Sequence, residues 1–248
     1  KDNNSDIRGA LAVKLARMTP HLPSDKREKL YQLTEEPLSI LAHDQVLRVR
    51  EILADALAEV ANAPASIIKA LANDTEITVA EPVLICSPVL SEKDLLQILS
   101  SDPIQGALTA ISKREEVSAN MANIIIKSGD TQAVTYLLKN HKAAIAEQDI
   151  DQVVDQALTV EEWHAPLVKR PLLSSRSICR LASFVAMNLL DKLQSRVDMD
   201  DETLIAVTQT VEKRTADEPK EEDKSRLSTM KNMVLHQRVL LKMYNIFL

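Results

Sequence analysis

The stretch from Asp44 to Asp74 contains two short amphipathic segments in succession, and this pairing limits what the chain can fold into. In the first segment, apolar residues recur at the three- and four-residue spacing of one helix face: Val46, Val49, Leu53, Leu57 and Val60. The second segment follows Pro64 and carries three more apolar residues: Ile67, Ile68 and Leu71. Two helices of this length cannot bury such a face by themselves, so they need neighbouring helices of similar design.

The composition favours helices throughout the chain. Only 2% of the 248 residues are aromatic and only three are glycine, so the core must consist mainly of Leu, Ile, Val and Ala, with few tight turns. We therefore predict an all-α protein. The formal net charge of −6 repels a phosphate backbone unless basic side chains gather on one face, which disfavours nucleic acid as a partner.

Similar pairs of segments continue along the chain and predict a helical repeat protein. Three leucines mark the repeat: Leu71, Leu99 and Leu137. Each lies three residues before a residue that can cap a helix: Asp74, Asp102 and Asn140. The intervals of 28 and 38 residues have a mean of 33, which is in the range of helical hairpins. We expect these leucines to be equivalent buried positions on the second helices of successive hairpins.

The repeat pattern divides the chain into two predicted parts. Residues 1–142 are expected to form a right-handed α-solenoid of degenerate helical hairpins. Residues 143–248 are expected to form a more compact helical segment, packed on the repeats. Within this segment, the polar run from Thr215 to Lys224 is the best candidate for a mobile loop.

Several motifs resemble known helical repeats. Asp44 followed by Val49 and Arg50 resembles the second-helix signature of HEAT-like repeats, which implies that Asp44 and Arg50 cap and bridge adjacent hairpins. The segment VAEPVL at 79–84 and the run LLKN at 137–140 resemble a family of uncharacterised HEAT-like proteins from alphaproteobacteria. This resemblance covers about residues 40 to 190. It implies a helical-repeat fold and supplies no catalytic residues.

The sequence motifs for catalysis and metal binding are incomplete. Glu161 and His164 have the spacing found in di-iron bundles, but the second such pair is missing. The chain lacks a G-x-S-x-G motif and a glycine-rich phosphate loop. Cys86 and Cys179, the two cysteines, lack the spacing of a zinc site. We therefore predict a protein that is not an enzyme and that holds no cofactor or metal.

Protein binding is the function class that needs least from such a sequence, because stacked hairpins provide a surface without special residues. We predict an adaptor or regulatory scaffold that binds a protein partner. Nucleic-acid binding and small-molecule sensing are the alternatives. One dense basic cluster could contact a partner or nucleic acid, although such clusters are more often a solvated face: Lys169, Arg170, Arg176 and Arg180.

The C-terminal stretch 224–248 is predicted to be a broadly apolar helix. Four of its residues are candidate contacts with a partner or a second copy: Met233, Leu240, Tyr244 and Phe247. The helix is expected either to pack on its own chain or to form a homodimer, with a membrane surface as a third alternative. No run of about 20 apolar residues and no signal-peptide pattern occurs, so we expect a cytoplasmic protein without a transmembrane segment.

Overall fold

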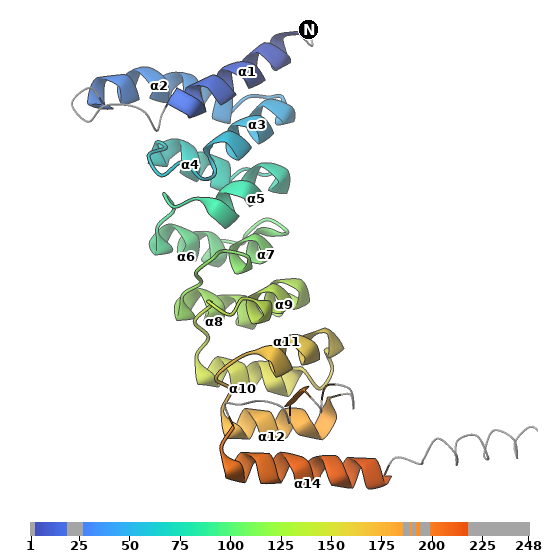
Figure 1. Ribbon diagram of the computed structural model, residues 1–248. Helices are drawn as coiled ribbons and strands as arrows, with labels where there is room; N and C mark the ends of the chain where they lie inside the picture. The colour runs from blue at the N-terminus through green and yellow to red at the C-terminus, as the bar shows by residue number, and fades with distance from the viewer. Residues whose placement is uncertain (1–2, 19–26, 186–188, 190–191, 194–198, 218–248) are drawn as a thin grey trace, which may run out of the picture. The chain divides into compact units, whose positions relative to one another are not determined.

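The computed structural model describes residues 3–18, 27–185, 189, 192–193 and 199–217, and every regular element in these ranges is a helix (Figure 1). The prediction of an all-α protein is therefore confirmed. Contacts divide the chain into two units, Lys1–Ser177 and Ile178–Leu248. The sequence predicts a boundary between residues 142 and 143. That a domain ends at this boundary stays a prediction. No helix in the described ranges is long and apolar enough to cross a membrane.

The first unit is a succession of short helices. They are α1 (Asn3–Met18), α2 (Arg27–Ala42), α3 (Leu47–Leu57), α4 (Ala65–Ala72), α5 (Ile77–Cys86), α6 (Glu92–Ser100), α7 (Ala107–Ser112), α8 (Ala119–Ser128), α9 (Thr131–Lys139), α10 (Glu147–Gln156), the 3₁₀ helix η2 (Glu161–Trp163) and α11 (His164–Lys169). Helix α12 (Ser175–Phe184) begins in this unit and ends in the second, which also contains α14 (Asp201–Asp217).

Helices of the first unit contact alternate neighbours along the chain. The odd-numbered helices form one series, in which α1 contacts α3, α3 contacts α5, α5 contacts α7, α7 contacts α9 and α9 contacts α11. Among the even-numbered helices, α2 contacts α4, α6 contacts α8 and α8 contacts α10. Figure 1 shows the two series as separate rows of ribbon. Each helix buries its apolar face between these neighbours, as Val49, Leu53 and Leu57 do on α3.

The three leucines that mark the predicted repeat are all buried, as expected. Their predicted equivalence is wrong for Leu137. Leu71 lies on α4 and Leu99 on α6, whereas Leu137 lies on α9, which contacts α7 in the odd-numbered series. Two helices, α7 and α8, lie between α6 and α9, so the interval of 38 residues leads from an even-numbered helix to an odd-numbered one. Leu41, at the end of α2 and three residues before Asp44, is the better counterpart of Leu71.

Arginine–aspartate pairs join successive odd-numbered helices at their N-terminal ends. Arg8 on α1 donates to Asp44, at 2.5 Å from its Nε, and Arg50 on α3 donates to Asp74, at 2.7 Å. Each aspartate precedes the next odd-numbered helix and also accepts the backbone N–H two residues later, from Val46 and Glu76. Arg50 further donates to the carbonyl of Asp44 at 2.8 Å. Asp44 and Arg50 therefore bridge successive odd-numbered helices, as the motif implied, but Val46 rather than Asp44 holds the N-cap position of α3. That these helices form HEAT-like hairpins stays a prediction.

In the second unit, Arg214 of α14 fixes the C-terminal end of α12. Its Nη1 donates to the carbonyl oxygens of Ala182, at 2.9 Å, and Val185, at 2.7 Å. These carbonyls belong to the last turn of a helix, where intrahelical partners are lacking. The predicted C-terminal helix and its four candidate contact residues, Met233, Leu240, Tyr244 and Phe247, lie outside the described residues.

Candidate functional site

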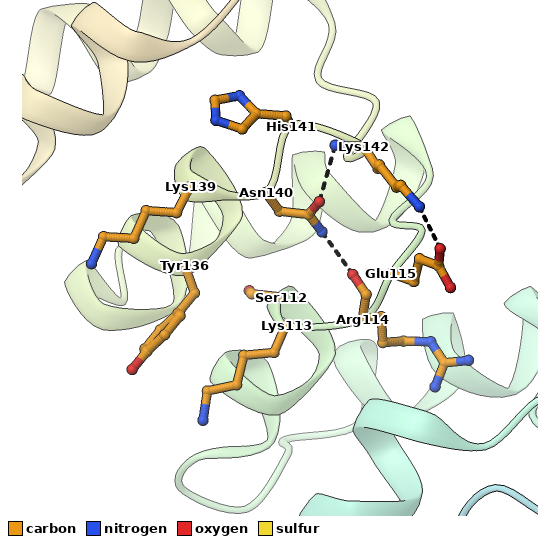
Figure 2. A pocket seen from close by; sticks show the side chains of 9 residues that line it. All are labelled: Ser112, Lys113, Arg114, Glu115, Tyr136, Lys139, Asn140, His141 and Lys142. Carbon is orange, nitrogen blue, oxygen red and sulfur yellow. Dashed lines mark hydrogen bonds and ion pairs between the residues drawn. The ribbon is translucent and has the colours of Figure 1, made fainter.

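A shallow pocket lies where α7 and α9 end, and it has a volume of about 420 Å³. Figure 2 shows the side chains that line it: Ser112, Lys113, Arg114, Glu115, Tyr136, Lys139, Asn140, His141 and Lys142. We call this site the basic pocket, because four of these residues are lysine or arginine and only Glu115 is acidic. Its residues come from two segments about 25 positions apart in the sequence.

Two adjacent helix ends create the pocket. Helix α7 ends at Ser112 and α9 ends at Lys139, and the two helices pack against each other. Asn140 ties the two ends together, because its Nδ2 donates to the carbonyl of Arg114 at 2.7 Å while its Oδ1 accepts the backbone N–H of Lys142 at 3.0 Å. The side chains that follow both helices are therefore held at one place.

Other side chains satisfy the carbonyl groups at the ends of these helices. Arg114 donates to the carbonyl oxygen of Leu84 in the last turn of α5, at 2.6 Å, and to that of Ser87 just after this helix, at 2.8 Å. Burial lowers the pKa of the Arg114 guanidinium. The guanidinium N–H groups nevertheless form hydrogen bonds with these two carbonyl oxygens. Asn140 donates to the carbonyl of Arg114, two residues after α7, as described above. Arg114 and Asn140 thus bond carbonyl groups at and just after the ends of α5 and α7 without help from the pocket lysines.

Arg170 donates to carbonyl groups at the C-terminal end of α9. Its guanidinium donates to the carbonyl oxygens of Leu138 at 3.4 Å, Asn140 at 3.1 Å and Ala143 at 2.6 Å, and the residue is 7% exposed. Burial lowers the pKa of Arg170. A chain of polar contacts therefore runs through the C-terminal ends of α5, α7, α9 and the residue that follows α11.

Tyr136 carries two ammonium groups close to its ring. The Nζ atom of Lys113 lies 4.9 Å from the ring centroid and that of Lys139 lies 5.5 Å from it, which is within the range of cation–π attraction. Lys113 also pairs with Glu81, at 2.8 Å. Lys139 is exposed and makes no ion pair with any residue that the structure describes.

A second lysine–glutamate pair borders the other side of the pocket. Lys142 donates to Glu115, and both side chains are exposed. The hydrogen bond from Lys142 lowers the pKa of the Glu115 carboxyl, and the same bond raises the pKa of the Lys142 ammonium. Water screens a pair this exposed, so it can open to admit another carboxylate at little cost.

The structure does not bring the four residues of the predicted basic cluster together on one exposed face. Lys169 and Arg176 are exposed, but Arg170 points inward to the carbonyls after α9. Arg180 is half-buried and belongs to the second unit. Arg170 is therefore a structural residue, because the unbonded carbonyls at a helix end attract a guanidinium. A contact role for the other three stays a prediction.

The remaining sequence candidates for chemistry are separate from the basic pocket. His164 uses its Nε2 to bond the carbonyl of Ala157 at 2.7 Å, and Glu161 is exposed on η2. Cys86 is exposed at the end of α5, whereas burial raises the pKa of the half-buried Cys179. Among the described residues, no group of three His, Cys, Asp or Glu side chains is placed to hold a metal ion.

Sequence reasoning missed the basic pocket because its charges are divided between two segments. Lys113 and Arg114 form one short basic group, and Lys139 to Lys142 form another. The available signal was their shared position just after a helix, where basic residues are common for structural reasons. Only the packing of α7 against α9 joins the two groups into one site.

Replacing Arg170 with methionine is expected to lower the free energy of unfolding by about 2–4 kcal/mol, because buried carbonyls lose a charged donor and no other donor replaces it. Urea denaturation followed by circular dichroism measures this change. The matched control is Arg176→Met on the exposed surface, which is expected to change the free energy by less than about 0.5 kcal/mol. Equal effects of the two substitutions would contradict the structural role of Arg170.

A protein-family model matches more than half of the chain. The model of a family described as "Uncharacterised protein conserved in bacteria (DUF2336)" matches residues 79–242. This range includes every residue of the basic pocket. No curated protein and no solved structure matches the chain.

Proposed function

We propose a function for this chain, which belongs to the DUF2336 family of bacterial proteins: it is a non-enzymatic adaptor or regulatory scaffold that binds a protein partner. The binding surface in this proposal is that of an α-solenoid built from degenerate HEAT-like hairpins. The basic pocket carries the proposal, because it presents charged and aromatic groups on a fixed backbone.

The succession of contacts in the first unit supports a repeat architecture. Each odd-numbered helix from α3 to α9 contacts the odd-numbered helix before it and the one after it. In helical-repeat proteins, each unit is stabilised mainly by its nearest neighbours, and the stacked units present a continuous surface for binding. The Arg8–Asp44 and Arg50–Asp74 pairs fit this interpretation, since the same bridge recurs between successive units.

The rigidity of the helix ends supports a binding role for the pocket. Asn140, Arg114 and Arg170 hold the backbone at the ends of α5, α7 and α9 through seven hydrogen bonds of 2.6 to 3.4 Å, six of which have a backbone carbonyl oxygen as acceptor. A preorganised site loses less conformational entropy when a partner binds. Aromatic residues such as Tyr136 are enriched at protein interfaces.

Affinity capture from the native bacterium tests the proposed function. The tagged full-length chain is recovered from cells after nuclease treatment, and the proteins that co-purify are quantified by mass spectrometry. We expect a protein that co-purifies in a fixed ratio and that recovers this chain when it is tagged in turn. Recovery of nucleic acid as the main companion, or of this chain alone, would contradict the proposal.

A further inference from the structure

We propose that the basic pocket binds an acidic segment of the partner protein, with side-chain carboxylates on Lys113 and Lys139 and an apolar side chain against Tyr136. This inference rests on the proposed function, since it names the chemistry of the partner. Three features of the pocket support it: the exposed charge of Lys139, the shape of the group around Tyr136, and the small number of charges in the pocket.

Lys139 is the lysine of the basic pocket that is available for a ligand, because Lys113 and Lys142 already pair with Glu81 and Glu115. At the end of a helix, a lysine commonly interacts with the exposed carbonyl groups. Here Arg170 donates to the carbonyl oxygen of Leu138 in α9, at 3.4 Å, and to that of Asn140 just after it, at 3.1 Å. Asn140 in turn donates to the carbonyl of Arg114, two residues after α7, at 2.7 Å. Lys139 has no carboxylate partner among the residues described. Its charge is therefore not needed to complete the ends of α7 and α9.

The group around Tyr136 has the form of a binding surface. In Figure 2, the side chains of Lys113, Tyr136 and Lys139 extend to the same side of the two helices, away from Arg114 and Lys142. Tyr136 is half-buried, so its ring is held in place and offers an apolar surface between two ammonium groups. Such a surface suits a peptide that alternates acidic and apolar side chains, because both kinds of group find a counterpart.

The existing ion pairs indicate which anion the pocket accepts. The carboxylate of Glu81 lies 2.8 Å from Lys113, and Glu115 pairs with Lys142, so protein carboxylates already bind these ammonium groups. A carboxylate from a partner can replace either one with similar geometry. A nucleic-acid backbone requires several phosphate contacts in a row, and the pocket offers few cations on a chain of net charge −6.

Fluorescence anisotropy with the purified full-length chain tests the proposed ligand. The probes are a short labelled peptide rich in aspartate, glutamate and leucine, its counterpart with asparagine and glutamine, and a single-stranded DNA of equal length. We expect the acidic peptide to bind, the amide peptide to bind more weakly, and affinity for the acidic peptide to fall as salt is added.

Two variants locate the binding to the basic pocket. The double substitution Lys113→Gln with Lys139→Gln is expected to weaken binding of the acidic peptide by about three- to tenfold, the size of two exposed charge pairs. The matched control is Lys127→Gln on α8, which removes an exposed lysine outside the pocket.

Three results would overturn the inference: no binding of the acidic peptide, equal weakening by the double substitution and the control, or tighter pocket-dependent binding of the DNA. The double variant also separates this inference from the proposed function. If affinity capture recovers the same partner with the double variant as with the unchanged chain, the inference is wrong and the adaptor function stands. If capture with the unchanged chain recovers no partner, the proposed function is wrong whatever the peptide result.

Discussion

Replacing Trp163 with alanine is expected to lower the free energy of unfolding by about 3–5 kcal/mol, the usual cost of removing a buried aromatic side chain. Trp163 is the single tryptophan of the chain and is 2% exposed. It ends η2, which contacts both α9 and α11, and its indole Nε1 donates to the carbonyl of Thr131 at 3.2 Å. The substitution therefore opens a cavity beside α9 and removes a hydrogen bond.

Urea denaturation followed by circular dichroism measures the effect of this substitution, since the signal does not depend on the tryptophan. Trp163→Phe keeps most of the apolar volume and is expected to cost clearly less than Trp163→Ala. Leu158→Ala, at a residue that is 63% exposed, is the surface control. A loss below about 1 kcal/mol for Trp163→Ala would contradict the packing of η2 against α9.

The helical class and most apolar faces could be predicted from the sequence, but some helix boundaries could not. An aspartate followed by a proline, as at Asp102 and Pro103, is typical of a helix start, whereas α7 begins at Ala107. Asp102 has a φ of 58° and Gly106 a φ of 96°, so the backbone turns twice before the helix begins. A Cβ at Gly106 would lie 2.9 Å from Ile77, so this turn depends on contact with α5. Such a tertiary contact leaves no local pattern in the sequence.

The candidate site could not be predicted from the sequence for the same reason, because it depends on tertiary contacts. Lys169, Arg170 and Arg176 are close in sequence, but Arg170 is directed at carbonyl groups that the sequence does not place near it. Lys113 and Lys139 are distant in sequence, yet both lie at the ring of Tyr136. Local density of charge indicates a surface cluster only when the side chains have no buried acceptors within reach. Whether buried acceptors lie within reach depends on which helices pack together, and that packing is a property of the whole fold.

Replacing Leu71, Leu99 or Leu137 with alanine is expected to cost about 2–5 kcal/mol of unfolding free energy in each case. Leu71 and Leu137 are fully buried and Leu99 is 5% exposed, so the first two should lie at the upper end of this range. Each removal leaves a cavity between neighbouring helices, and the cost depends on how far those helices can close it. Urea denaturation of the three variants gives the values directly.

Leu41→Ala extends this series and tests the revised repeat. If Leu41 on α2 is the counterpart of Leu71 on α4, the two substitutions should cost similar amounts, because both leucines are buried three residues before an aspartate that pairs with an arginine. Ile40→Ala is the matched control, since Ile40 is adjacent on α2 and 65% exposed. A loss below about 1 kcal/mol at any two of Leu71, Leu99 and Leu137 would contradict their place in the core. A large loss at Leu71 with a negligible one at Leu41 would instead show that α2 and α4 are not equivalent units, since neighbouring repeats of one design should share the same buried position.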